Sequence, residues 1–321
     1  MTRRTNLLSI TALLLAACGG DAPEPAASPD TLTPAAGAMT ISGEFRTPES
    51  VLHDPEADVY LVSNIDGAPL EKDGNGFISR VRPDGTVEDL RWIDGAAGAV
   101  RLSAPKGMAI RGDSLFVTDI DSVRIFHRTS GEPQGAWGVP GATFLNDLAV
   151  GEAGLYVSDT GLRMGEGGFE PSGTDAVWLF DASGVATSLS AGPELMAPNG
   201  LVAEGSGVVV APFGGSELLR VNAQGERSSL ATLPAGQLDG LVRLDDGSFL
   251  VSSWEGGAVY RVRAGGEARA VVEGLEAPAD IGWDAGRDRL LIPLFNANRI
   301  EVREIAPDAP SGEAEATDST P

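Results

Sequence analysis

The chain repeats one pattern six times. Each copy holds an anchor residue, an apolar run, a tight turn, a second run, another turn and a third run, and weaker fourth runs such as "TVEDLRWI" and "ARAVVEG" follow. The anchors, spaced by 57, 40, 53, 40 and 40 residues, are Glu49, Lys106, Asn146, Asn199, Asp239 and Ala279. Short runs between Gly- and Asp-containing turns predict antiparallel strands. Six such copies predict an all-β, six-bladed β-propeller of four-stranded antiparallel blades, because a β-sandwich would not explain copies in register.

The two ends of the chain differ from the repeats. Arg3 and Arg4 precede an apolar stretch, so residues 1–17 are predicted to be a signal peptide. "Leu15-Ala16-Ala17-Cys18" resembles the bacterial lipoprotein signal, in which the cysteine is lipidated. Residues 18–39 are then a disordered tether, 40–305 the propeller and 306–321 a disordered tail. "MTISGEF" is expected to supply the outermost strand of the last blade and close the ring.

Charge and rare residues exclude several functions. Without the two arginines of residues 1–17, the chain has 21 basic and 46 acidic residues, a formal charge of −25, so it should not bind nucleic acid. Cys18 is the single cysteine, so with Cys18 lipidated no thiol remains for a disulfide, a nucleophile or a zinc site. His53 falls in a turn on the far face and His127 ends a third run, so a Ser-His-Asp triad is not expected.

The anchors predict a site at one mouth of the central channel. The first strand of a propeller blade lines the channel, so all six anchors should converge there. Glu49, Asn146, Asn199 and Asp239 bring four oxygen-bearing side chains to this mouth. Crowded carboxylates need protons or a cation between them, and oxygen-only ligands favour a hard cation, most simply Ca²⁺. A turn cap is the alternative for any one of these residues alone.

At this point the sequence resembles a known family. The motifs "PES", "ND", "PNGL" and "LDG" follow in order at the anchors, as in the gluconolactonase, senescence-marker-protein and luciferin-regenerating-enzyme-like propellers, which are related to the paraoxonases. The resemblance covers residues 40–305. It implies that Glu49, Asn199 and Asp239 bind a divalent metal and that Asn146 contacts metal or substrate. It also implies hydrolysis of a lactone or related ester. In such a hydrolase we expect Asp239 to bind the metal and help deprotonate the attacking water.

Lys106 departs from that family pattern. An ammonium at the rim of a dication site is unfavourable unless acids intervene. It could bind a substrate carboxylate or an oxyanion, which would make Lys106 catalytic together with Asp239 and Asn146. Alternatively, it could pair with Glu49 or Asp239 and replace the metal. The chain would then be a non-catalytic ligand- or protein-binding propeller.

Two long insertions and five rim residues should shape specificity. "NIDGAPLEKDGNG" in the first repeat and "DTGLRMGEGGFEPSGTD" in the third are expected to rise over the channel mouth. The residues expected on the same rim are Asp119, Asp159, Phe213, Trp254 and Asn296. The expected partners are a small lactone, ester or other ligand, and the protein is expected to be a monomer.

Lipidation of Cys18 would hold the exported protein at a membrane, on the periplasmic or cell-surface side. The absence of an aspartate after Cys18 favours the outer membrane. Cys18→Ser should move the protein from the detergent phase to the soluble fraction, because acyl chains contribute about 0.8 kcal/mol per buried CH₂. Phase partitioning measures this, and unchanged partitioning of the variant would remove the lipoprotein interpretation.

Overall fold

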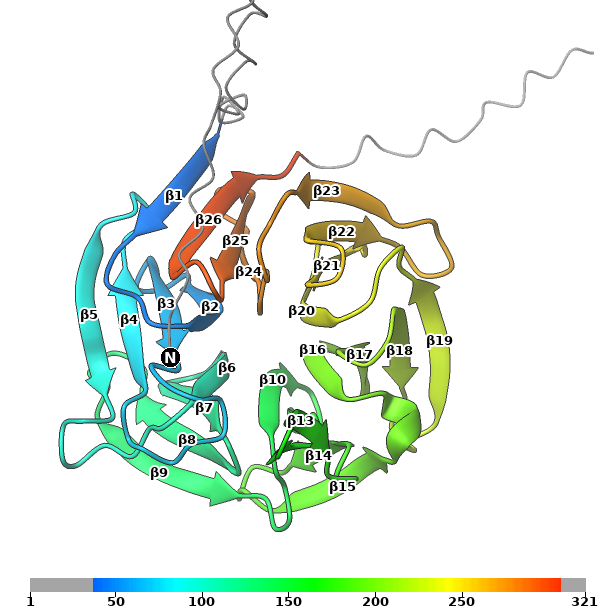
Figure 1. Cartoon of the computed structure of the whole chain (residues 1–321), viewed down its shortest axis with the longest axis horizontal. Helices are drawn as coiled ribbons and strands as arrows, with labels where there is room; N and C mark the ends of the chain where they lie inside the picture. The colour runs from blue at the N-terminus through cyan, green and yellow to red at the C-terminus, as the bar shows by residue number, and fades with distance from the viewer. Residues whose placement is uncertain (1–36, 307–321) are drawn as a thin grey trace, which may run out of the picture. The chain divides into compact units, whose positions relative to one another are not determined.

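The computed structural model describes residues 37–306, which form a ring of six four-stranded antiparallel sheets around a central channel (Figure 1). The predicted six-bladed propeller is therefore confirmed. Cys18, the signal peptide, most of the tether and the tail lie outside the described residues. Apart from one short 3-10 helix, η1 (Pro193–Leu195), the regular secondary structure of the described part is all strand. This part contains no helix long and apolar enough to cross a membrane.

The first three blades follow each other along the chain, each running from the channel outward. Blade one consists of β2 (Pro48–Asp54), β3 (Val59–Asn64), β4 (Phe77–Val81) and β5 (Val87–Asp94). Blade two consists of β6 (Pro105–Arg111), β7 (Ser114–Asp119), β8 (Ser122–His127) and β9 (Pro133–Gly138). Blade three consists of β10 (Leu145–Gly151), β11 (Gly154–Asp159), β14 (Ala176–Phe180) and β15 (Ala186–Ala191). Its insertion forms a separate hairpin of β12 (Leu162–Gly165) and β13 (Gly168–Pro171).

The last three blades continue the same order. Blade four consists of β16 (Pro198–Glu204), β17 (Gly207–Pro212), β18 (Glu217–Val221) and β19 (Arg227–Thr232). Blade five consists of β20 (Leu238–Arg243), β21 (Phe249–Ser253), β22 (Ala258–Val262) and β23 (Arg269–Glu273). Blade six consists of β24 (Gly282–Asp284), β25 (Arg289–Leu294), β26 (Arg299–Glu304) and, on its outer edge, β1 (Ala38–Ser42).

Strand β1 closes the ring as predicted. It pairs antiparallel with β26, so the last blade contains strands from both ends of the propeller. The strand starts at Ala38, two residues before the predicted start of the propeller. Tyr60 Oη of blade one also donates to Asp284 Oδ2 of blade six at 2.7 Å. Closure by strand exchange and by this buried contact holds the first and last blades together.

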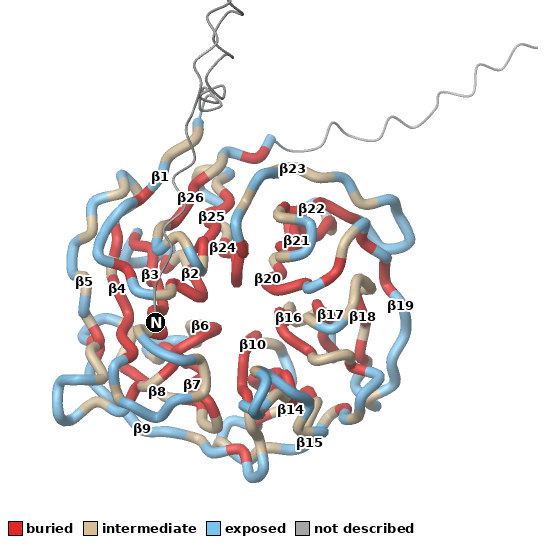
Figure 2. Tube along the Cα trace, viewed as in Figure 1, coloured by how far each residue is buried: buried red, intermediate tan, exposed pale blue. Residues whose placement is uncertain are grey.

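The hydrophobic core lies between neighbouring blades (Figure 2). One cluster joins Leu61 and Ile78 of blade one to Leu115 and Val117 of blade two. Inner and middle strands are buried, whereas the outermost strands β5, β9 and β19 carry mostly exposed or half-buried residues. Burial of apolar side chains between sheets, at about 25 cal/mol per Å², therefore fixes the blades radially around the channel.

Candidate functional site

The inner strands of blades one to five are each interrupted by a β-bulge at the anchor. In β10, Leu145 pairs with Asp159 and Leu148 pairs with Val157, so Asn146 and Asp147 together oppose one residue, Ser158. The same register shift occurs at the anchors of β2, β6, β16 and β20. A bulge bends the strand and changes the direction of its side chains. The repeated interruption thus places equivalent side chains at one end of the channel.

Hydroxyl groups replace the backbone pairing that the bulges remove. Ser252 Oγ accepts from Gly240 N at 2.7 Å and donates to Ala279 O of the next blade at 2.8 Å. Ser158 Oγ accepts from Asp147 N at 2.9 Å and donates to Asn199 O at 2.7 Å. Each hydroxyl therefore satisfies its own bulge and also holds the next inner strand in place.

Glycine after three anchors allows the inner strands to approach closely. A Cβ at Gly200 would lie 2.1 Å from Asp239 O, and one at Gly240 would lie 2.2 Å from Ile281 N. A Cβ at Gly107 would lie 2.3 Å from Asp147 Oδ1. These distances are below any real contact, so only glycine permits this spacing of the inner strands.

The five bulged anchors line one cavity of about 340 Å³ at the channel mouth. Glu49, Lys106, Asn146, Asn199 and Asp239 form its polar floor, and each side chain is at least 95% buried. Ala279 does not line it; its carbonyl serves the hydroxyl link to Ser252. The structure thus brings together every residue expected to bind metal or take part in catalysis.

Three acceptor oxygens on this floor have no hydrogen-bond partner. They are Glu49 Oε2, Asn199 Oδ1 and Asp239 Oδ1, which come from blades one, four and five. Buried polar atoms are normally satisfied, so a group of orphaned acceptors points to a missing cationic or donor ligand. Within residues 37–306, no three His, Cys, Asp or Glu side chains form a metal cluster. The candidate set instead combines two carboxylates with amide oxygens, which suit a hard cation.

Burial and mutual repulsion perturb the carboxyl groups of the floor. Burial, followed by the charges of Asp239 and Asp280, raises the pKa of Glu49 well above its usual range, and the Lys106 ammonium opposes this rise. Burial and the charge of Asp280 likewise raise the pKa of Asp239. The neighbouring Trp254 and Asn199 side chains favour the charged form and lower this pKa, but by less. Ionising this floor at neutral pH is therefore costly without a bound cation.

Lys106 is buried in the floor but makes no ion pair with it. Its Nζ donates to Pro69 O at 3.1 Å and to Ala104 O at 3.0 Å, and it lies 4.7 Å from the centroid of the Phe144 ring. Both of these hydrogen bonds go to backbone carbonyls rather than to a carboxylate. Burial lowers the pKa of Lys106 to about 8, although the charges of Glu49 and Asp119 act against this. One of its three ammonium hydrogens remains for a ligand.

A second pair of acids lies deeper in the channel. Asp147 Oδ1 and Oδ2 accept from Leu148 N and Leu201 N, each at 2.6 Å, and Asp280 Oδ2 accepts from Ser50 Oγ at 2.5 Å. Burial raises the pKa of Asp147, as does the charge of Asp280, whose own pKa burial raises to about 7. These two acids hold the inner strands in place beneath the floor.

The cavity wall comes from one position repeated in every blade, the residue directly after the second strand. Its backbone nitrogen or oxygen bonds to the loop ahead of the anchor, as in Trp254 N to Gln237 O at 3.0 Å and Phe213 N to Ala197 O at 2.8 Å. We call these six residues the upper ring. They are Ile65, Ile120, Thr160, Phe213, Trp254 and Phe295. All except Ile120 line the cavity.

Three of the five expected rim residues do not line the cavity. Asp119 Oδ1 accepts from Ala104 N at 2.8 Å, and its Oδ2 is paired with Arg124 at 3.0 Å. Asp159 Oδ1 accepts from Phe144 N at 3.0 Å. Asp119 and Asp159 each directly precede an upper-ring residue in the sequence, and their carboxylates cap backbone N–H groups instead of facing the cavity. Asn296 directly follows the upper-ring residue Phe295 and is exposed. Phe213 and Trp254 were at the correct phase of the repeat and do line the cavity.

The sequence pattern did not predict several of the residues that line the cavity. Phe295 and Ile65 could have been found by keeping a fixed offset from the end of each second strand. No repeated position in the sequence marks Phe144, which stands two residues before its anchor, or Pro69. The third insertion does reach the site, because Leu162 and Phe169 of its hairpin line the cavity, as Pro69 of the first insertion also does.

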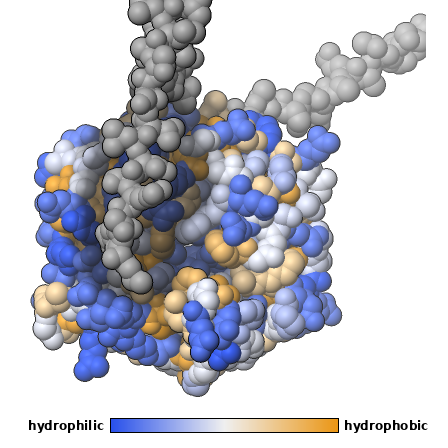
Figure 3. All heavy atoms as spheres, viewed as in Figure 1, coloured by the Kyte–Doolittle hydropathy of each residue, from blue (hydrophilic) through white to orange (hydrophobic). Residues whose placement is uncertain are grey.

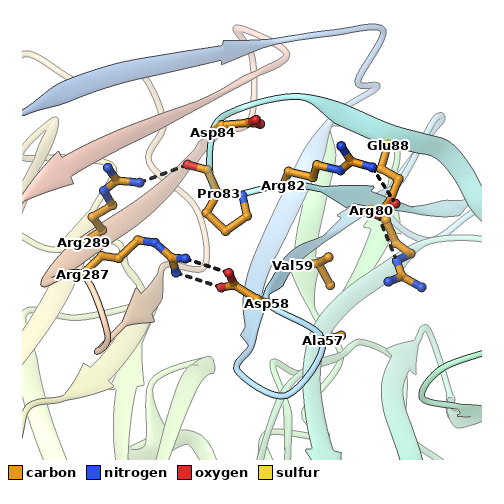
Figure 4. A pocket seen from close by; sticks show the side chains of 10 residues that line it. All are labelled: Ala57, Asp58, Val59, Arg80, Arg82, Pro83, Asp84, Glu88, Arg287 and Arg289. Carbon is orange, nitrogen blue, oxygen red and sulfur yellow. Dashed lines mark hydrogen bonds and ion pairs between the residues drawn. The ribbon is translucent and has the colours of Figure 1, made fainter.

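A larger cavity of about 630 Å³ lies at the junction of blades one and six (Figure 4). Arginines dominate it, but each one visible there is engaged. Arg287 pairs with Asp58 at 2.7 Å, Arg289 donates to Pro83 O at 3.0 Å, and Arg82 pairs with Glu88 at 3.2 Å. Exposed pairs of this kind contribute at most about 1 kcal/mol each. Arg80 Nε has no hydrogen-bond partner there, but it lies 3.8 Å from Glu88 Oε2, so its charge is paired. This cavity is therefore a seam that closes the ring, and its unpartnered atom is a paired cation rather than a group of acceptors like that of the channel mouth.

Solved structures with the same fold include lactonases and lyases. A gluconolactonase from Xanthomonas campestris has a TM-score of 0.64 at 19% identity, covering 83% of this chain and 88% of that one. A putative gluconolactonase has a TM-score of 0.61 at 16% identity, covering 84% and 94%. A virginiamycin B lyase from Staphylococcus aureus has a TM-score of 0.56 at 12% identity, covering 84% and 98%. At these identities the likeness establishes the propeller fold alone.

No protein-family model matches this sequence, and no curated protein sequence matches it. The chemistry must therefore be argued from the site itself.

The buried acids predict a stability that falls as pH rises when no cation is present. Between about pH 4 and 7, Asp280 is protonated in the folded protein but ionised in the unfolded chain. The folded state then binds more protons, so each such group lowers the free energy of unfolding by about 1.4 kcal/mol per pH unit. Asp280→Asn should flatten this slope, as measured by urea unfolding in chelator at pH 4.5 to 7. The exposed Asp245→Asn should leave the slope unchanged, and equal slopes in wild type and Asp280→Asn would contradict the assignment.

Proposed function

We propose that this protein is a divalent-cation-dependent hydrolase of a lactone or related ester. The observation that carries the proposal is the set of three buried, unpartnered acceptor oxygens on Glu49, Asn199 and Asp239. They share one concave cavity with a buried lysine, and pockets with few convergent polar groups are the usual form of small-molecule sites. The gluconolactonases of the same fold add support for this reaction class.

The donor set fits Ca²⁺ better than other biological metals. Glu49, Asn199 and Asp239 would hold the ion, with the Asn146 side-chain oxygen as a further ligand. The Asn146 amide nitrogen donates to Thr160 Oγ1 at 3.1 Å, which leaves its oxygen as the free polar atom. Ca²⁺ accepts mixed carboxylate and amide oxygens in irregular arrangements, whereas Mg²⁺ requires near-octahedral geometry. When bound, the cation would polarise the substrate carbonyl.

The protein's own groups supply the remaining chemistry. The Asp239 carboxylate, with its raised proton affinity, is the group we assign to take a proton from the attacking water. Lys106 Nζ, fixed by two backbone carbonyls, would donate its third hydrogen to the substrate oxygen that becomes negative. Trp254 Nε1 is buried and makes no hydrogen bond of normal geometry, but it is near enough to Asp239 to favour its charged form, and it offers a second donor there.

The position of the histidines favours a hydrolase over a lyase of the same fold. A catalytically inactive form of the S. aureus virginiamycin B lyase replaces a histidine with alanine. Here neither histidine lines the candidate cavity, since His53 lines a different pocket and lies 3.6 Å from Asp284, and His127 ends β8. The candidate cavity therefore has no histidine to act as a general acid or base.

The alternative function is a ligand-binding propeller in which Lys106 replaces the metal. That interpretation requires Lys106 to neutralise the acids directly, yet its ammonium is bonded to Pro69 O and Ala104 O. We therefore rank it second. Tethering to a membrane through Cys18 suits either function and remains a separate proposal.

Removing one charge from the floor tests the metal directly. Ca²⁺ at 100 times its dissociation constant should stabilise the wild type by about 2.7 kcal/mol and raise its Tm by about 5–10 °C. Asp239→Asn keeps the shape but removes a ligand charge, so it should abolish most of this rise and the lactonase activity. Differential scanning calorimetry with and without Ca²⁺ measures the rise, and Asp245→Asn is the exposed control.

Lys106→Met separates the two functions. If Lys106 serves the substrate, the variant keeps the Ca²⁺-dependent rise in Tm and loses turnover. If Lys106 replaces the metal, the wild type shows no such rise and the variant gains one. The second outcome would contradict the metallohydrolase proposal.

A further inference from the structure

The walls of the candidate cavity differ from its floor in chemistry. Of the five upper-ring residues that line it, only Thr160 is polar. Its single hydroxyl hydrogen is committed to Pro198 O at 2.9 Å, and the same oxygen accepts from Asn146 at 3.1 Å. The walls therefore offer a substrate no free side-chain donor except the Trp254 indole. Polar contacts are confined to the floor, where the reacting group would sit.

Three aromatic rings form a continuous arc on one side of the cavity. Phe213 and Trp254 meet edge to face with centroids 5.6 Å apart, and Trp254 and Phe295 follow at 5.2 Å. The three residues belong to blades four, five and six at the same phase of the repeat. They are only half-buried, so apolar ring surface remains available to a ligand.

The hairpin inserted in blade three supplies the facing wall. Phe169 of β13 lies 5.8 Å from Phe144 between ring centroids and lines the cavity. Phe169 and its cross-strand partner Met164 are 50% and 57% exposed, and they are two of the three large hydrophobic residues exposed within residues 37–306. In Figure 3 hydrophilic and apolar residues are mixed over the visible face, and apolar residues are among those near its middle. Exposed apolar surface concentrated beside a cavity marks a ligand-binding surface.

From these walls we infer that the site takes a lactone or ester carrying an apolar substituent, alkyl or aryl, in preference to a polyhydroxylated sugar lactone. The inference rests on the proposed function and specifies its substrate class. The reacting carbonyl lies on the polar floor, and the substituent lies between the aromatic arc and the hairpin. Each sugar hydroxyl placed there would lose its water without gaining a partner. Each buried methylene instead contributes about 0.8 kcal/mol, about a fourfold gain in affinity.

The experiment compares turnover across substituents. The probes are unsubstituted γ-butyrolactone, γ-lactones with four- and seven-carbon chains, a phenyl-substituted γ-lactone and an aldono-1,5-lactone, each with full-length protein in Ca²⁺. We expect kcat/KM to rise at least tenfold from the unsubstituted to the four-carbon lactone. We expect the aldonolactone to be about 100-fold poorer than the best alkyl or aryl lactone. Equal or better turnover of the aldonolactone would overturn the inference and leave the hydrolase proposal intact.

A binding measurement separates this inference from the hydrolase proposal. Cyclopentanones with the same alkyl and phenyl substituents cannot be hydrolysed, and calorimetric titration follows their binding. If no lactone is turned over but affinity still rises with substituent size, the apolar site stands and the hydrolase proposal fails. If affinity does not depend on the substituent, the inference fails whatever the activity.

A matched pair of variants locates the effect at the arc. Phe213→Asn and Phe213→Leu have similar size, but only leucine keeps an apolar wall. The ratio of kcat/KM for the seven-carbon lactone to that for the unsubstituted lactone should fall at least fivefold in Phe213→Asn and stay within twofold in Phe213→Leu. The cyclopentanones should lose affinity in the same order, with thermal melting as the check on folding. An unchanged ratio in Phe213→Asn would place the substituent elsewhere and contradict the inference.

Discussion

The site depends on the broken pairing at the start of each inner strand. If β2, β6, β10, β16 and β20 paired without interruption, successive side chains would alternate between the two faces of their own blade. The bulge adds one residue, and the hydroxyl of Ser158 or Ser252 then bonds to its own strand and to the next. This link fixes the positions of neighbouring anchors relative to each other. A rigid ring of anchors can hold a ligand without reorganisation.

The same arrangement buries several acidic side chains close together, where ionising them costs free energy. Glu49, Asp147, Asp239 and Asp280 are all buried around one channel, and Lys106 is the buried cation beside them. Such a cluster persists either by holding protons or by binding a cation. Two of the four differ from the others: Asp147 is satisfied by two backbone nitrogens and Asp280 by a hydroxyl. Glu49 and Asp239 keep unpartnered oxygens, so we place the proposed cation site at the mouth of the channel.

The sequence alone predicted the ring and its anchors because both repeat in register. The phase of Glu49, Asn199 and Asp239 in their copies was enough to place them together. Prediction failed for Asp119 and Asp159, whose carboxylates were expected to face the rim but cap backbone nitrogens of the preceding loop. The sequence pattern cannot distinguish a strand-end carboxylate that binds a ligand from one that caps a turn. The unbonded oxygens and the aromatic contacts between blades depend on distances across the ring, which no local pattern encodes.

The central claim is that the orphaned oxygens of three blades hold one cation. A crystal grown with Ca²⁺ or Mn²⁺ and measured for anomalous scattering tests this most directly. We expect a single anomalous peak at the channel mouth, at 2.3–2.6 Å for Ca²⁺ from oxygens of Glu49, Asn199 and Asp239. Lys106 Nζ should remain on Pro69 O and Ala104 O. A floor without such a peak, with Lys106 turned onto Glu49 or Asp239, would contradict the account.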